Sequence, residues 1–213
     1  LAVVNPADLA VESLRSLRTS LHFGMMDARN NILMISGPSP GVGKTFVSAN
    51  LAAVMAMANQ RVLLVDADLR RGFSHDVFGV SNHKGLSDLL ADKATLEEAT
   101  EHGGVEGLDF ISRGTVPPNP SELLMSKRFD EFLKQASENY DLVIVDTPPI
   151  LAVTDPAIVG KHAGTTMLVA RFGANPAKEL ELTKRRFEQN GIEVKGVIFN
   201  AVEKKASNYG YGG

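Results

Sequence analysis

Residues 36–45 are Ser-Gly-Pro-Ser-Pro-Gly-Val-Gly-Lys-Thr, the most informative motif of the chain. An apolar run over 32–35, which predicts a strand, precedes it, and a helical pattern over 45–59 follows it. Glycines let backbone N–H groups approach a polyphosphate closely, and the following helix points its positive end at the anion. A lysine and a threonine at the end of such a loop suit phosphate and Mg²⁺. The stretch therefore predicts a phosphate-binding loop that takes ATP or GTP.

The loop departs from the usual spacing of such loops. A glycine is expected five residues before the glycine of Gly43-Lys44-Thr45, but Pro38 stands there and Gly37 lies one residue earlier. The alternative interpretation is a plain turn rich in glycine and proline. The strand before the loop and the helix after it argue against that alternative, so we expect a variant phosphate-binding loop.

Two further apolar runs end in aspartate. The run over 62–65 leads to Asp66 and then Asp68, and the run over 142–145 leads to Asp146. Neither run alternates, which is typical of strands buried on both faces of a parallel sheet. Ligands of open α/β sheets gather at the carboxyl ends of strands, so we expect these aspartates beside the loop. A cap or a turn is the alternative for each aspartate alone, and the convergence of three argues against it.

Composition sets the class of the chain. It has 213 residues, 44% of them hydrophobic and 22% charged, which suits one α/β domain with a full core. The net charge of −3 gives no electrostatic footprint for nucleic acid, and the absence of cysteine excludes a disulfide framework and a thiolate zinc site. The longest strongly apolar stretch, over 51–58, is too short to span a bilayer. We expect a soluble cytoplasmic piece, excised from a longer protein because it begins at Leu1.

Helical and strand patterns alternate along the chain without an internal repeat. Strands are predicted over 32–35, 62–66, 108–111, 142–146, 165–170 and 194–200. Helices are predicted over 6–21, 45–59, 86–90, 96–102, 121–137, 155–161 and 176–189. Alternation of this kind predicts an α/β fold with a mostly parallel, doubly wound sheet flanked by helices. Asp66 and Asp68 would share one face of the sheet if their strand continued through Asp68.

The chain resembles the bacterial protein-tyrosine kinases, a family of P-loop NTPases. Three motifs are similar to the family's Walker A, A′ and B set, namely Gly41-Val-Gly-Lys-Thr45, Val65-Asp-Ala-Asp-Leu-Arg-Arg71 and Val143-Ile-Val-Asp-Thr-Pro-Pro149. The segment Arg113-Gly-Thr-Val-Pro-Pro-Asn-Pro-Ser-Glu-Leu-Leu124 matches the family after its third main strand. The resemblance covers nearly the whole chain. It is strongest to the cytoplasmic domain of Gram-negative polysaccharide co-polymerases, which is fused to a two-pass membrane chain-length regulator.

The resemblance implies an ATP-dependent tyrosine autokinase that regulates capsule or exopolysaccharide polymerisation and export. The catalytic candidates are Lys44, Asp66 and Asp68. The candidates for holding Mg²⁺ are Thr45, Asp66 and Asp146. The candidates for ATP binding are Gly41, Val42, Gly43, Lys44, Thr45, Phe46 and Asn200. Whether Asp66 or Asp68 accepts the tyrosine proton stays open, and a strand-end turn explains Asn200 as well as adenine recognition does.

The same resemblance divides the chain into a kinase domain over 1–204, with an oligomerisation helix over 1–22, and a flexible tail over 205–213. The ring-forming motif of the family matches Glu12, Arg15 and Arg18, although a plain Glu12–Arg15 surface pair is the alternative. The expected assembly is a homo-oligomeric ring, with an octamer as a candidate size. In it, phosphate passes in trans to Tyr209 and Tyr211 of a neighbour.

The resemblance also implies further partners and a location. The implied partners are the membrane-spanning region of the parent protein and a low-molecular-weight tyrosine phosphatase, and the implied location is the cytoplasmic face of the inner membrane. Tyr140 precedes a buried strand, so we expect it to be structural rather than a phosphate acceptor.

Two other function classes stay open. A partitioning-type ATPase would use hydrolysis as a dimerisation switch, and a scaffold would bind nucleotide without catalysis. Partitioning ATPases carry a signature lysine two residues before Gly41-Val-Gly, where this chain has Ser39. Because the kinase family also lacks that lysine, Ser39 favours the kinase.

Overall fold

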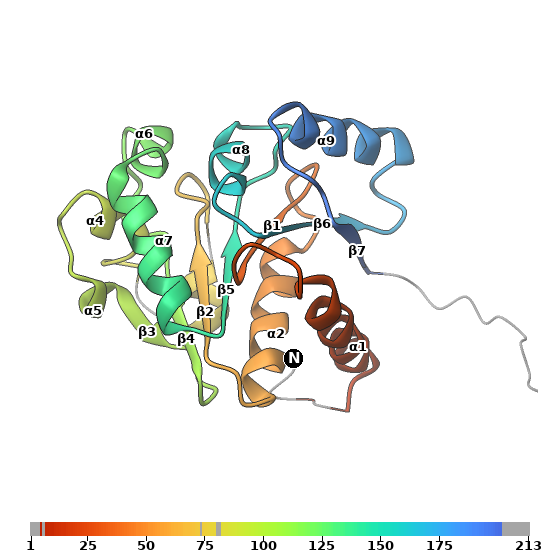
Figure 1. Cartoon of the computed structure of the whole chain (residues 1–213), viewed down its shortest axis with the longest axis horizontal. Helices are drawn as coiled ribbons and strands as arrows, with labels where there is room; N and C mark the ends of the chain where they lie inside the picture. The colour runs from red at the N-terminus through yellow and green to blue at the C-terminus, as the bar shows by residue number, and fades with distance from the viewer. Residues whose placement is uncertain (1–4, 6, 73, 80–81, 202–213) are drawn as a thin grey trace, which may run out of the picture.

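The computed structural model describes residues 5, 7–72, 74–79 and 82–201, and shows a twisted sheet between two layers of helices (Figure 1). The strands of this part are β1 (Ile32–Ser36), β2 (Val62–Asp66), β3 (Thr100–His102), β4 (Leu108–Ile111), β5 (Leu142–Asp146), β6 (Thr165–Arg171) and β7 (Gly196–Asn200). Their order in the sheet is β3-β4-β2-β5-β1-β6-β7. Every neighbouring pair is parallel except β3 with β4. The prediction of a mostly parallel α/β sheet is therefore confirmed.

The helices divide between the two faces of the sheet. They are α1 (Leu9–Gly24), α2 (Lys44–Met57), α3 (Ser74–Phe78), α4 (Leu86–Leu90), α5 (Leu96–Ala99), α6 (Pro120–Leu124), α7 (Lys127–Asn139), α8 (Asp155–Gly160) and α9 (Ala177–Gln189). On one face α1 and α2 pack around a core that includes Leu33 and Ile144, and on the other α4 and α6–α9 pack around a core that includes Val143 and Val145. The alternation of core residues along β5 explains why its run is apolar throughout.

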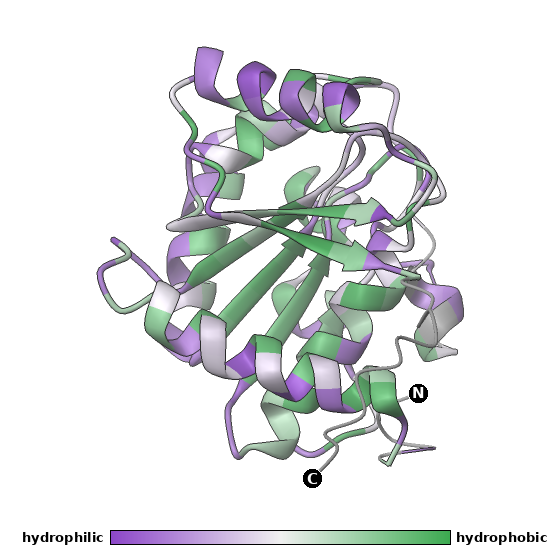
Figure 2. Cartoon of the chain, turned by 90° about the vertical axis from the view of Figure 1, so that its right-hand side faces the viewer, coloured by the Kyte–Doolittle hydropathy of each residue, from purple (hydrophilic) through white to green (hydrophobic). Residues whose placement is uncertain are grey.

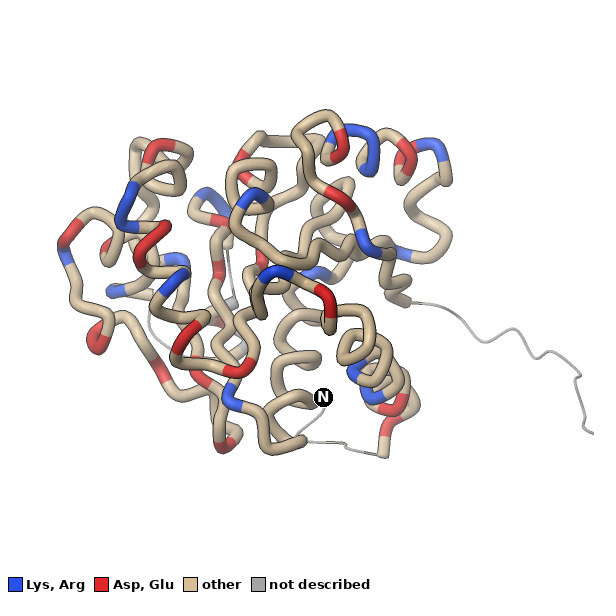
Figure 3. Tube along the Cα trace, in the orientation of Figure 1, with Lys and Arg blue, Asp and Glu red and all other residues tan. Residues whose placement is uncertain are grey.

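Hydropathy and charge follow this layering. The strands in the middle are the most apolar part of the fold (Figure 2). Lysine, arginine, aspartate and glutamate gather on the outer helices, most densely on α9 and α7 (Figure 3). No helix in the described part of the chain is both long and apolar enough to cross a membrane.

Three predictions for local structure are wrong in detail. The helix predicted over 96–102 ends at Ala99, because the next three residues pair with the edge of β4 as β3. The helix predicted over 121–137 is two helices, since the Ser126 hydroxyl accepts the N–H of Phe129 and starts α7 afresh. The strand predicted from Val194 begins only at Gly196. The short α3 was not predicted at all.

The carboxyl edge of the sheet brings the predicted site together. In β2, β5 and β1, which are adjacent in the sheet, Asp66 is in register with Asp146, and Asp146 with Ile35. The loop over 37–43 leaves β1 just beyond Ile35 and enters α2. The three motifs of the sequence therefore end side by side at one edge.

Candidate functional site

The loop between β1 and α2 has the backbone of a phosphate cradle. Gly41 and Gly43 have φ values of 75° and 88°, which only glycine adopts readily. A Cβ on Gly43 would also lie 2.0 Å from Nδ2 of Asn200. The N-terminus of α2 follows at once, so its unpaired N–H groups point into the loop. The loop thus fits a polyphosphate by backbone geometry alone.

The irregular spacing of the loop also has a structural reason. A Cβ on Gly37 would lie 2.8 Å from the carbonyl oxygen of Val169 in β6. The loop passes so close to β6 at this point that a side chain would displace one or the other. Glycine is therefore required at position 37, and Pro38 follows the point of close approach to β6.

A buried carboxylate joins the loop to the sheet. Asp146, with 2% of its surface exposed, lies with Oδ1 3.3 Å from Nζ of Lys44 and accepts the hydroxyl of Thr45 at Oδ2, 3.0 Å away. Burial raises the pKa of Asp146, and the charge of Lys44 and the bond from Thr45 act against that rise. One lysine, one hydroxyl and one carboxylate from two distant motifs thus meet in one place.

Asp66 and Asp68 reach the edge in different ways. β2 ends at Asp66, so the strand does not continue through Asp68, and the condition under which the two would share a strand face is not met. Instead the chain turns sharply, and the N–H of Asp68 donates to Oδ1 of Asp66 over 3.1 Å. Asp66 is fully buried and Asp68 is half-buried. The turn continues to Gly72, where a Cβ would lie 2.5 Å from both carboxylate oxygens of Asp66.

Asn200 reaches the same loop from the end of β7. Its Nδ2 donates to the carbonyl oxygen of Val42 over 3.1 Å. Val42 is buried, whereas Phe46, in the first turn of α2, exposes 44% of its surface. All the residues predicted to bind ATP therefore surround one loop, and the Asn200 side chain braces it.

The donor set suits a hard cation. Thr45, Asp66 and Asp146 offer hydroxyl and carboxylate oxygens, which are the ligands that Mg²⁺ prefers. Within the ranges that the structure describes, no group of three or more His, Cys, Asp or Glu side chains could hold a metal by itself. Mg²⁺ in phosphate-binding sites keeps several waters and takes further ligands from the phosphates, so a sparse protein set fits it. The fold and the loop imply a nucleotide with a divalent metal.

The structure shows four further residues around the turn after β2 to which sequence reasoning assigned no functional role. They are Arg70, Arg113, Ser121 and Asp155. Arg70 binds the buried Asp155, and the hydroxyl of Ser121 donates to the same carboxylate. Arg113 donates to the carbonyl oxygen of Gly72. Asp155 carried no signal beyond a helix start before proline. The hints were the place of Arg70 in the second motif and of Arg113 and Ser121 in the segment over 113–124.

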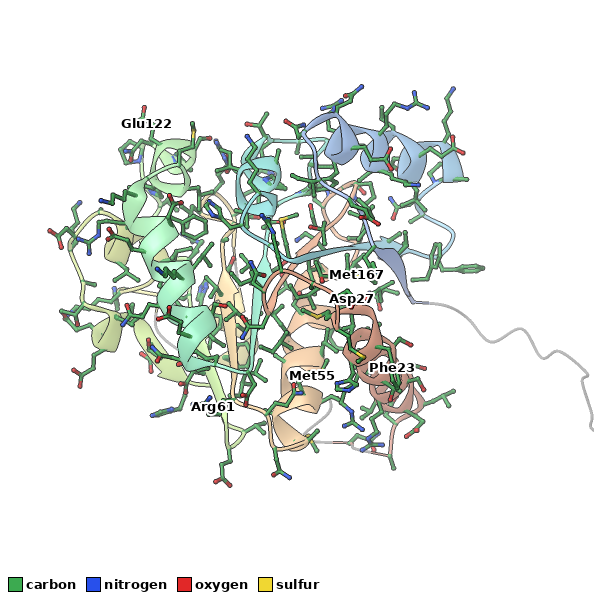
Figure 4. All side chains as sticks on the ribbon, in the orientation of Figure 1. Phe23, Asp27, Met55, Arg61, Glu122 and Met167 are labelled. Atoms are coloured by element: carbon green, nitrogen blue, oxygen red, sulfur yellow. The ribbon has the colours of Figure 1, made fainter. Side chains whose placement is uncertain are left out.

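The ring-motif residues lie on α1. Arg15 donates to Glu12 over 3.0 Å, as the plain surface-pair alternative predicted. Arg18 lines a pocket of about 640 Å³ between the C-terminal ends of α1 and α2, where Phe23 and Met55 also lie (Figure 4). The acceptor candidates Tyr209 and Tyr211 lie outside the described residues.

Tyr140 is structural, as predicted. Its hydroxyl donates to Oδ2 of Asp109 over 2.6 Å, and the residue is half-buried. Burial and the bond to Asp109 raise the pKa of Tyr140. A phenol held in this way is a poor phosphate acceptor.

Fold and site together define a P-loop nucleotide-binding α/β domain. Residues 30–161 match the family model described as an AAA domain. The chain is 58% identical over 209 residues to the tyrosine-protein kinase wzc of Salmonella typhimurium, covering 98% of this chain and 29% of that protein. It is 60% identical over 212 residues to the tyrosine-protein kinase etk of Escherichia coli, covering 99% of this chain and 29% of that protein.

A solved structure gives the same result. The kinase domain of the Escherichia coli tyrosine kinase ETK superposes with a TM-score of 0.93 at 58% identity, covering 99% of this chain and 84% of that one. The chain therefore belongs to the AAA domain family and, within it, to the bacterial tyrosine-protein kinases. It spans about 29% of the length of the curated relatives.

Proposed function

We propose that this chain is a tyrosine autokinase domain, which transfers the γ-phosphate of ATP to tyrosines in the tail over 205–213. The observation that carries the proposal is the single carboxylate of Asp146, which contacts both Lys44 and Thr45 and stands in register with Asp66. This arrangement supplies a cation, a metal-binding hydroxyl and two acids at the mouth of a phosphate cradle. Phosphoryl transfer needs such positioning and charge more than covalent help.

The residues divide the work as follows. The N–H groups of the loop and of the first turn of α2 bind the phosphates, and Lys44 leaves Asp146 to meet the β- and γ-phosphates. Thr45 would hold Mg²⁺ directly and Asp146 would hold it through water. In that position the bound ion would supply positive charge that stabilises the phosphates during transfer. Asp66 and Asp68 remain for the metal and for the tyrosine proton.

The acids differ in access, which makes their roles separable. Asp66 is fully buried against Gly72, whereas Asp68 is half-buried and so remains partly accessible from solvent. Asp66→Asn and Asp68→Asn should both reduce transfer. The variant that removes the proton acceptor should lose transfer to tyrosine while keeping its affinity for Mg²⁺-ATP, and the variant that removes a metal ligand should also bind Mg²⁺-ATP more weakly.

The assembly and partners form part of the same proposal. We take from the family likeness a homo-oligomeric ring through Glu12, Arg15 and Arg18, transfer in trans, a membrane-spanning region in the parent protein and an opposing tyrosine phosphatase. Regulation of capsule or exopolysaccharide export and a location at the cytoplasmic face of the inner membrane complete it. The limits proposed are 1–204 for the domain and 205–213 for the tail.

The partitioning-type ATPase is the rival function, and Ser39 argues against it. Nδ2 of Asn175, in the loop between β6 and α9, donates to Oγ of Ser39 over 3.1 Å. This chain thus has a short polar side chain, hydrogen-bonded within the chain, where such ATPases carry a lysine. Ser39 provides no positive charge that could contact the phosphates of another subunit.

Incubation of the purified chain with ATP and Mg²⁺, followed by mass spectrometry of the C-terminal peptide, tests the proposal. We expect phosphate on Tyr209 or Tyr211 in the wild type and none in Lys44→Met, which keeps its fold. Release of free phosphate without tyrosine modification would instead support the rival ATPase.

A further inference from the structure

The turn that carries Asp68 is held from outside by side chains of distant segments. Arg70 leaves this turn and donates through Nε to Oδ2 of Asp155, 2.9 Å away, and through Nη2 to Oδ1, 3.2 Å away. A two-pronged arginine–carboxylate pair fixes the orientation of both partners more tightly than a single bond does. Arg70 thus ties the turn to the start of α8.

Ser121 closes the contact into a three-membered cluster. Its hydroxyl donates to Oδ1 of Asp155 over 2.7 Å and accepts from Nη2 of Arg70 over 3.1 Å. Asp155 is fully buried, whereas 38% of the Arg70 side chain is exposed. We call Arg70, Ser121 and Asp155 the anchor cluster. It joins the turn after β2 to α6 and α8, which are otherwise far away in the sequence.

The same turn holds the Asp68 carboxylate through its backbone. Oδ1 of Asp68 accepts the N–H groups of Arg70, 3.2 Å away, and of Arg71, 3.0 Å away. The N–H of Gly72 donates to the carbonyl oxygen of Asp68 over 2.8 Å, and Arg113 donates to the carbonyl oxygen of Gly72. Arg70 therefore binds Asp68 with its backbone and Asp155 with its side chain, so a shift of one moves the other.

We propose that the anchor cluster positions Asp68 for phosphoryl transfer, and that the segment over 113–124 supplies two of the contacts, from Arg113 and Ser121, that set this position. The proposal rests on the proposed kinase function. It gives a physical task to a segment that the sequence marked only by resemblance. A fully buried carboxylate paired with arginine is a poor device for stability alone, because apolar residues of similar volume often stabilise a core at least as well. A displacement of about 1 Å at a reacting group costs up to about 100-fold in rate.

Matched substitutions separate positioning from bulk stability. Arg70→Lys keeps the charge but loses the two-pronged geometry, and Ser121→Ala removes both hydrogen bonds of the hydroxyl, to Asp155 and from Arg70. The controls are their exposed neighbours: Arg71→Lys, and Glu122→Gln on the outer side of α6 (Figure 4). We expect kcat for tyrosine phosphorylation to fall about tenfold in Arg70→Lys, with the Kd for ATP changed less than twofold. The double variant should be no slower than Arg70→Lys, because the cluster acts as a unit.

Amide hydrogen exchange of a peptide covering 66–72 provides a readout that needs no kinase activity. Exchange at this turn should accelerate in Arg70→Lys and Ser121→Ala and stay unchanged in both controls. If exchange accelerates in the two variants but the wild-type chain phosphorylates no tyrosine, the positioning of Asp68 is upheld and the proposed function is overturned. Wild-type kcat and unchanged exchange in Arg70→Lys would overturn the positioning role. A parallel loss of kcat, ATP affinity and melting temperature would do so as well, because it would show a merely structural role.

Discussion

The two halves of the site are built by opposite means. The loop over 37–45 depends on its own backbone, with Gly41 and Gly43 in left-handed conformations and the α2 N-terminus directly behind them. The turn over 66–72 depends on side chains that come from α6, α8 and the segment after β4. The conformation of the loop therefore depends mainly on one continuous stretch of sequence, whereas that of the turn depends on contacts with segments that are distant in the sequence.

The sharpest way to break the loop is a methyl group at Gly43. Gly43→Ala would force an L side chain into a φ of 88° and place its Cβ 2.0 Å from Asn200. We expect ATP affinity to fall about 100-fold because the cradle must shift. Gly41→Ala is the matched control, since its φ is 75° but no atom lies within 4 Å of the added Cβ. Titration of both variants with nucleotide should show the larger loss at position 43, and equal losses would contradict the close-approach argument.

The turn should break differently. In Gly72→Ala the added Cβ would meet both carboxylate oxygens of Asp66 at 2.5 Å, which displaces an acid rather than the cradle. We expect kcat to fall about tenfold while the Kd for ATP changes little. Steady-state kinetics with an independent binding measurement would check this. A loss confined to ATP affinity would show that the turn belongs to the cradle after all.

The sequence predicts the phosphate-binding loop better than the turn over 66–72, because the loop depends on local residues and the turn on distant ones. Lys44, Thr45 and Asp146 are brought together as predicted, because parallel strands with apolar runs end at one edge. The condition for a shared strand face at Asp68 is not met, because the Asp66 carboxylate accepts the N–H of Asp68 where the chain turns. Asp155 carried no local signal, since its partners lie 34 and 85 residues away.

The interface on α1 offers a smaller effect. Charge reversal of Arg15 and Arg18 removes the partner of Glu12 and places two negative charges on one helix face. By the family likeness we expect a monomer whose autophosphorylation is about fivefold slower, the size of a coupling of about 1 kcal/mol. Light scattering measures the assembly, and an oligomer of unchanged mass would contradict the proposed interface.

The smallest effect concerns stability. Burial raises the pKa of Asp146 above its value in the unfolded chain. The folded state therefore becomes less stable as pH rises through the native pKa and the carboxyl group ionises. Asp146→Asn should therefore abolish transfer yet melt at the wild-type temperature or up to about 4 °C higher at neutral pH. The gain should shrink on acidification. A melting temperature several degrees lower would mean that the Lys44 pair stabilises the fold.

Transfer of phosphate to the tail of a neighbouring chain can be measured in a mixture of two variants. One chain carries Lys44→Met with both tail tyrosines intact, and the other is active but carries Tyr209→Phe and Tyr211→Phe. After incubation with ATP and Mg²⁺, we expect phosphotyrosine in the tail of the Lys44→Met chain only when the active chain is present. Free phosphate without phosphotyrosine on either chain would contradict the account.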